Sequence, residues 1–123
     1  MNIIIDSSGW IEYFSGGKNC EKFDELIKDI ENLTVPAITI YEVYKKFISE
    51  ADETIAIKVT VQMRKAKVLE LNEYLSVWAA KISKDLKIPM ADSIILASAY
   101  ATNSTLYTMD SDFKGIQGVE YIS

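Results

Sequence analysis

The chain alternates between short, unbroken apolar runs and longer stretches in which apolar residues recur every three or four positions. The first run, with three isoleucines inside residues 2–6, is typical of a strand buried on both faces. Similar short runs predict strands at residues 33–35, 67–71, 105–108 and 119–122. The longer periodic stretches lie between these runs and predict helices over residues 21–30, 39–48, 73–86 and 90–102.

Local signals place the starts of two helices. Ser7 and Ser8 offer an N-cap for a short helix that ends at Gly16, and Thr39 to Glu42 has the spacing of a capping box. Residues 54–63 fit both a strand and a helix; we favour a helix, because the strand at 67–71 follows directly. Alternating strands and helices predict an α/β fold with a central parallel sheet and helices on both faces.

Composition restricts the chemistry. The 123 residues match one domain over residues 1–123, and no apolar run is long enough to span a membrane. A single cysteine and an N-terminus without a basic, apolar leader favour a cytoplasmic location. The absence of histidine excludes Ser-His-Asp and Cys-His catalysis, and the net charge of −5 argues against broad adhesion to phosphate.

Carboxylates follow the predicted strands. Asp6 ends the first strand, Glu42 lies in the first predicted turn of the helix after the second strand, and Asp92 lies in the first turn of the helix before the fourth. Asp110 and Asp112 follow that fourth strand. Because the carboxyl ends of parallel strands meet at one edge, where open sheets bind ligands, we expect these side chains to converge.

Each carboxylate also has a purely structural interpretation as a helix cap, a dipole partner or a turn former. Convergence argues against that interpretation. Two carboxylates ~4 Å apart repel by about 4 kcal/mol at an effective dielectric of roughly 20. One or two Mg²⁺ or Mn²⁺ ions would neutralise the cluster, and the helix N-termini would keep its members ionised. Such ions activate water for attack on a phosphodiester.

Four segments together resemble the PIN domain family. They are residues 4–14, Thr39 to Glu42, residues 88–99, which include Ala91-Asp92-Ser93, and residues 106–113, which include Thr108-Met109-Asp110. The resemblance implies a three-layer α/β/α fold and a Mg²⁺- or Mn²⁺-dependent endoribonuclease acting on single-stranded RNA. It implies catalytic and metal-binding roles for Asp6, Glu42, Asp92 and Asp110, with Asp112 a further candidate ligand and with Ser7 and Thr108 as supporting hydroxyls.

The short chain looks most like the VapC branch, whose members are toxins of type II toxin–antitoxin pairs. That resemblance implies a homodimer and an antitoxin partner. Among the basic residues, Lys45 and Lys46 are the first candidates for RNA binding, because they follow Glu42 on the same predicted helix. The aromatic set Trp10, Tyr13, Phe14, Tyr41 and Tyr44 suits either the core or a partner surface.

Two other functions remain open. A catalytically silent PIN-like binding or scaffold module would keep the fold without needing its acids. An aspartate phosphotransfer domain also places Asp at strand ends, but it requires a second acid close after the first strand, where this chain has Ser7-Ser8.

Overall fold

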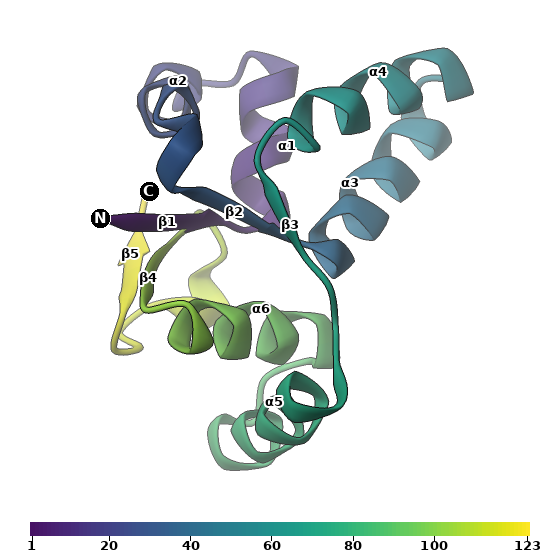
Figure 1. Cartoon of the computed structure of the whole chain (residues 1–123). Helices are drawn as coiled ribbons and strands as arrows, with labels where there is room; N and C mark the ends of the chain where they lie inside the picture. Colours follow the sequence, from purple (N-terminus) through teal and green to yellow (C-terminus); the bar gives the residue numbers. More distant parts are fainter.

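The computed structural model describes residues 1–123 and is built around a five-stranded sheet (Figure 1). The strands are β1 (Asn2–Ile5), β2 (Leu33–Pro36), β3 (Lys67–Leu69), β4 (Ser104–Thr108) and β5 (Val119–Tyr121). Their order is β3-β2-β1-β4-β5, and every neighbouring pair is parallel. The expected parallel sheet is therefore confirmed, with β1 in its centre.

Helices cover both faces of the sheet, which makes three layers (Figure 1). One layer holds α1 (Ser7–Ser15), α2 (Cys20–Lys28), α3 (Ala37–Glu50) and α4 (Glu53–Met63), and the other holds α5 (Glu73–Leu86) and α6 (Met90–Ala101). Two short 3-10 helices, η1 (Ile30–Asn32) and η2 (Ser111–Phe113), complete the connections. The ambiguous segment 54–63 is a helix, as favoured above. None of the helices has both the length and the apolar character needed to cross a bilayer.

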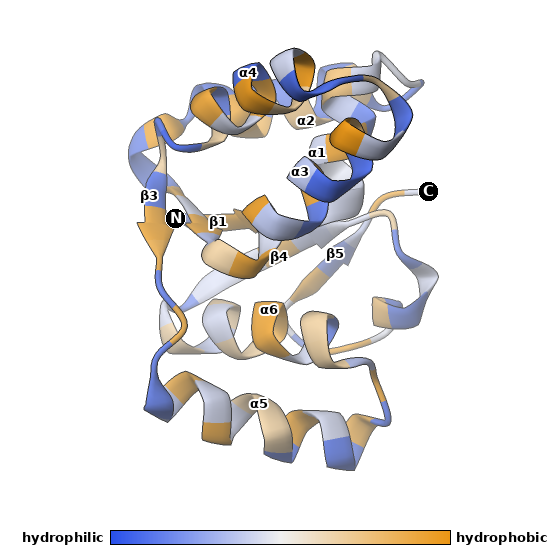
Figure 2. Ribbon diagram, turned by 90° about the vertical axis from the view of Figure 1, so that its right-hand side faces the viewer, coloured by the Kyte–Doolittle hydropathy of each residue, from blue (hydrophilic) through white to orange (hydrophobic).

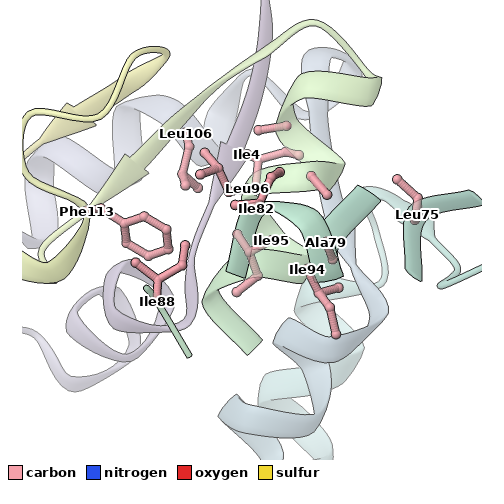
Figure 3. Close-up of a cluster of buried hydrophobic side chains, with 12 residues drawn as sticks. Ile4, Leu75, Ala79, Ile82, Ile88, Ile94, Ile95, Leu96, Leu106 and Phe113 are labelled. Carbon is pink, nitrogen blue, oxygen red and sulfur yellow. The ribbon is translucent and has the colours of Figure 1, made fainter. Parts of the chain in front are cut away.

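The alternation of side chains along β1 divides the core into two clusters. Ile3 and Ile5 face the layer of α1 to α4, where Trp10 and Phe23 are completely buried. Ile4 faces α5 and α6 and packs into the cluster shown in Figure 3. A strand buried on both faces needs apolar residues at every position, which explains the unbroken isoleucine run.

Two predicted helix starts are wrong. Asp6, not Ser7 or Ser8, is the N-cap of α1, and it accepts the backbone N–H of Gly9. Helix α3 begins at Ala37 after Pro36, so Thr39 lies inside its first turn, buried and without a hydrogen-bond partner. The extended backbone of Pro36 starts the helix two residues early, which removes the capping box.

Gly9 marks the closest packing between α1 and its neighbours. A Cβ at this position would lie 2.5 Å from Cγ2 of Ile5 and 2.6 Å from the ring of Phe23. Both of these side chains are fully buried and cannot move aside freely. The absence of a side chain at position 9 lets α1 lie against β1, and this contact places the start of α1 beside the carboxyl edge.

We predict that Gly9→Ala lowers the free energy of unfolding by about 1–3 kcal/mol, the usual cost of overpacking. This outcome is decisive because alanine should otherwise stabilise a helix interior by about 1 kcal/mol. Urea unfolding measures the change, with Ser49→Ala on the exposed face of α3 as the control for helix propensity alone. A more stable Gly9→Ala protein would contradict the packing described here.

Candidate functional site

Five carboxylates gather at the carboxyl edge of the sheet. Asp6 directly follows β1, Asp110 and Asp112 follow β4, and Asp92 lies in the first turn of α6. Glu42 lies in the second turn of α3, not the first as predicted, because that helix begins at Ala37. Burial, and after it the negative charges of the other four acids, raises the pKa of Asp92, so the structure brings all five into one electrostatic environment.

The tightest group consists of Asp92, Asp110 and Asp112. Each offers one carboxylate oxygen, and these oxygens lie within 4.8 Å of one another. Asp110 also accepts the backbone N–H of Asp112 at 2.9 Å, which begins η2 and fixes the spacing of the pair. Asp110 is half-buried and Asp112 is exposed. Both acids that follow β4 therefore lie close to Asp92, and the structure does not favour one of them over the other as the nearer candidate ligand.

Asp6 lies deeper and is held by hydrogen bonds. Its Oδ1 accepts the hydroxyl of Ser8 at 2.6 Å and the N–H of Gly9 at 3.2 Å, and its Oδ2 accepts the hydroxyl of Thr108 at 2.6 Å. Burial raises the pKa of Asp6 to about 6, although these hydrogen bonds lower it in part. The carboxylate of Asp6 is therefore fixed in orientation and expensive to ionise.

Ser8 is a site residue that the sequence analysis missed. Besides donating to Asp6, its Oγ accepts the N–H of Met109 at 3.0 Å. Thr108 acts in parallel, because its Oγ1 accepts the N–H of Asp110 at 2.9 Å while it donates to Asp6. These two hydroxyls join the end of β1 to the end of β4. The only sequence signal was a serine two residues after Asp6, which we assigned to helix capping.

Glu42 carries an unsatisfied atom. Its Oε1 is buried and has no hydrogen-bond partner. Burial, and next the charge of Asp110, raise the pKa of Glu42, while the side chain of Ser7 lowers it in part. A buried carboxylate oxygen without a partner is costly, and here it lies beside further negative charge.

Asp92 does not behave as its position in the helix predicts. A helix N-terminus should favour the ionised form, but burial and the neighbouring carboxylates raise the pKa of Asp92 from 3.8 to about 7. The expectation that helix N-termini keep the acids ionised is therefore wrong for this residue. The favourable dipole is worth only ~0.3–1 kcal/mol, which burial together with several like charges at short range exceeds.

No basic side chain neutralises the acidic cluster. The chain contains two ion pairs, Lys28 with Asp24 and Lys46 with Glu50, and both lie along exposed helix faces. Lys45 has no carboxylate partner, and its Nζ lies 5.9 Å from the ring centroid of Tyr41. Hence the lysines predicted to bind RNA lie near the cluster without being paired to it.

A pocket of about 400 Å³ is shared by these lysines and Glu42. It is lined by Ser7 and Ile11 of α1 and by residues of α3, namely Tyr41, Glu42, Lys45, Lys46 and Ser49. Of the aromatic residues considered above, Trp10 is fully buried in the core and cannot form a partner surface. Tyr41 is 58% exposed and borders this pocket.

The donor set fits a hard divalent cation. Asp92, Asp110 and Asp112 offer carboxylate oxygens only, Glu42 adds an unpartnered Oε1 outside that group of three, and no ion pair brings positive charge to them. Mg²⁺ and Mn²⁺ prefer oxygen ligands of this type. Binding a cation would lower the cost of ionising Asp6 and Asp92 together.

Comparison with known proteins identifies the family and agrees with the fold. The family model of the PIN domain matches residues 3–119. No curated protein matches the sequence. Among solved structures, a toxin–antitoxin complex from Klebsiella pneumoniae has a similar chain with a TM-score of 0.81 and 21% identity, over 98% of this chain and 100% of that one.

Two further structures share the fold at lower identity. The VapC20 toxin of Mycobacterium tuberculosis, described as cleaving the sarcin–ricin loop, has a TM-score of 0.76 and 12% identity over 94% of this chain and 95% of that one. A DNA-bound VapBC complex from Salmonella typhimurium has a TM-score of 0.77 and 13% identity over 99% and 97%. Because the family model covers nearly the whole chain, this protein belongs to the PIN domain family.

Proposed function

We propose that this protein is an endoribonuclease that depends on Mg²⁺ or Mn²⁺ and cleaves single-stranded RNA. The observation that carries the proposal is the acidic cluster without counter-charge, in which Asp92, Asp110 and Asp112 present oxygens within 4.8 Å of one another. These three acids, with Glu42 and Asp6, would hold one or two ions. A bound divalent ion supplies an activated water and neutralises charge on the phosphodiester.

The side chains of the protein then have distinct tasks. Ser8 and Thr108 hold the carboxylate of Asp6 in one orientation, so that its position does not depend on the ion. Glu42 closes the cluster on the side of the α3 pocket. Lys45 and Lys46 provide positive charge next to the acids, where RNA phosphates would approach.

The proposal also covers assembly and location. The protein would form a homodimer, bind an antitoxin and act in the cytoplasm, where its RNA substrate occurs. Similar solved chains belong to toxin–antitoxin complexes. The structure adds an apolar groove of about 390 Å³ between Phe14 and α4. Ile55, Ile57 and Val61 line it and are 39–45% exposed, and hydrophobic segments of α4 are visible in Figure 2. An exposed apolar patch of this kind supports a protein partner.

The first test is cleavage of single-stranded and structured RNAs with Mg²⁺, with Mn²⁺ and with EDTA. Asp6→Asn and Asp92→Asn should each reduce cleavage by at least about 100-fold, because removal of even an indirect partner of a metal site costs ~10–100-fold. Asp85→Asn, on the exposed face of α5, is the matched control and should cut normally. No cleavage by folded protein free of a copurified inhibitor would instead favour a silent binding module.

A second prediction concerns the metal-free protein. The pKa of Asp92 is about 7 in the folded chain and 3.8 without the fold, so the folded state binds more protons between these values. Stability in EDTA should therefore fall as pH rises from about 4 to 7, and Asp92→Asn should show a smaller fall. Melting temperatures measured across this range report the difference.

Millimolar Mg²⁺ should then raise the melting temperature of the unsubstituted chain at pH 8 more than that of Asp92→Asn. If the difference in melting temperature between the two proteins is constant with pH, Asp92 does not titrate in this window. If Mg²⁺ raises both melting temperatures equally, Asp92 does not contribute to a metal site.

A third prediction concerns the lysines. Lys45→Ala combined with Lys46→Ala should weaken RNA binding and lower the slope of log K against log salt by about 2, one for each phosphate contact. Fluorescence anisotropy in an Asp92→Asn background measures the RNA affinity and its salt slope without cleavage. In the double-lysine variant that keeps Asp92, calorimetry should find Mg²⁺ binding unchanged. The matched pair Lys81→Ala with Lys84→Ala on α5 should have a smaller effect; equal slopes would refute the assignment.

A further inference from the structure

We infer that the ring of Tyr41 is a stacking platform for one unpaired nucleobase of the RNA, next to the acidic cluster. This inference rests on the proposed ribonuclease function and deepens it, because it assigns the α3 pocket to a base and its phosphate. The aromatic set was considered above only as core or partner surface, and the structure separates Tyr41 from it. Trp10 is buried at 1% exposure, whereas Tyr41 is 58% exposed.

The position of Tyr41 relative to the acids carries the first step. Tyr41 and Glu42 are neighbours in α3 and line the same pocket of about 400 Å³. Glu42 belongs to the cluster through its electrostatic coupling to Asp92 and Asp110. A group bound against Tyr41 therefore shares a pocket with Glu42. The volume of this pocket lies in the range typical of small-ligand sites, ~300–1,000 Å³.

The chemistry of the pocket carries the second step. Besides the aromatic ring, the pocket offers Lys45 and Lys46, and Ser7, Ile11 and Ser49 complete its lining. The ammonium of Lys45 lies over one face of the Tyr41 ring, 5.9 Å from its centroid, so the base would stack on the opposite face. An aromatic face combined with nearby cations is how proteins bind single-stranded nucleic acid, by stacking on the base and pairing with its phosphate.

The binding mode also restricts the substrate. A base can stack on a tyrosine only when it is unstacked from its own neighbours, so the platform accepts loops, bulges and single strands. Stacking depends little on base identity, because every base has a π-face. Tyr41 therefore selects unpaired RNA over duplex without selecting a sequence.

Equilibrium binding of a fluorescein-labelled eight-nucleotide RNA with Mg²⁺, in the Asp92→Asn background, tests the inference. Tyr41→Ala should weaken binding by about 5- to 100-fold, while Tyr41→Phe, which keeps the ring, should bind within about twofold of the background. Tyr74→Ala is the matched control, because Tyr74 is an exposed tyrosine (66%) on α5, across the sheet. A duplex of the same sequence should be insensitive to Tyr41→Ala.

A scan of RNAs with one abasic position sharpens the test. At the position that stacks on Tyr41, removal of the base should weaken binding to the background protein as much as Tyr41→Ala does, and the two changes together should cost no more than one. Additive losses at every position would overturn the stacking, as would unchanged affinity of Tyr41→Ala. Loss of a dimer in light scattering with normal RNA affinity would show that Tyr41 contacts a second copy instead.

The cleavage assay separates this failure from failure of the proposed function. If the unsubstituted chain cuts RNA and Tyr41→Ala binds normally, only the stacking is wrong. If the unsubstituted chain neither cuts nor binds RNA, both are wrong.

Discussion

Repulsion among carboxylates that have no counter-charge within the chain determines how the carboxyl edge of this sheet is built. The oxygens of Asp92, Asp110 and Asp112 lie within 4.8 Å of one another, and at that limit an ionised pair costs about 3–4 kcal/mol at an effective dielectric of roughly 20. The total stability of a domain of this size is only ~5–15 kcal/mol, so several such pairs consume a large share of it. The metal-free protein reduces this cost by retaining protons: burial first, and then the charges of neighbouring acids, raise the pKa values of Asp6 and Asp92.

The strand order supplies the rigidity that makes this arrangement possible. β1 and β4 are neighbours in the centre of the sheet, and Ile5 pairs with Tyr107, which places Asp6 beside Thr108. Ser8 and Thr108 convert this register into a fixed carboxylate orientation. A site that holds mutually repelling side chains binds a ligand more tightly when those side chains are already ordered. No further loss of conformational entropy then accompanies binding.

Local pattern was sufficient for the elements but not for their junctions. The isoleucine run before Asp6 predicts β1, because only a strand buried on both faces requires it. The helix over 54–63 follows from the short distance to the next strand. Thr39 and Glu42 were read as a capping box because their spacing is right, but Pro36 starts the helix earlier and tertiary burial takes Thr39 into the core.

The features of the site that could not be predicted from the sequence depend on contacts between residues far apart in the chain. Convergence of the acids follows from chain topology, so it was predictable, whereas their functional roles stay a prediction. The link from Ser8 to Met109 joins residues 101 positions apart, and no local signal reports it. The raised pKa of Asp92 likewise depends on burial and then on four acids from other segments, so the helix-dipole argument, which uses only local position, gave the wrong direction.

An acidic nuclease must solve a problem that basic RNA-binding proteins do not have. With a net charge of −5, the chain as a whole repels its proposed substrate, so attraction has to be local. Lys45 and Lys46 provide it only beside the cluster, and Lys46 is partly neutralised by Glu50. Affinity that depends little on charge, such as base stacking, then becomes more valuable than in a basic protein, and an exposed tyrosine beside Glu42 is placed to supply it.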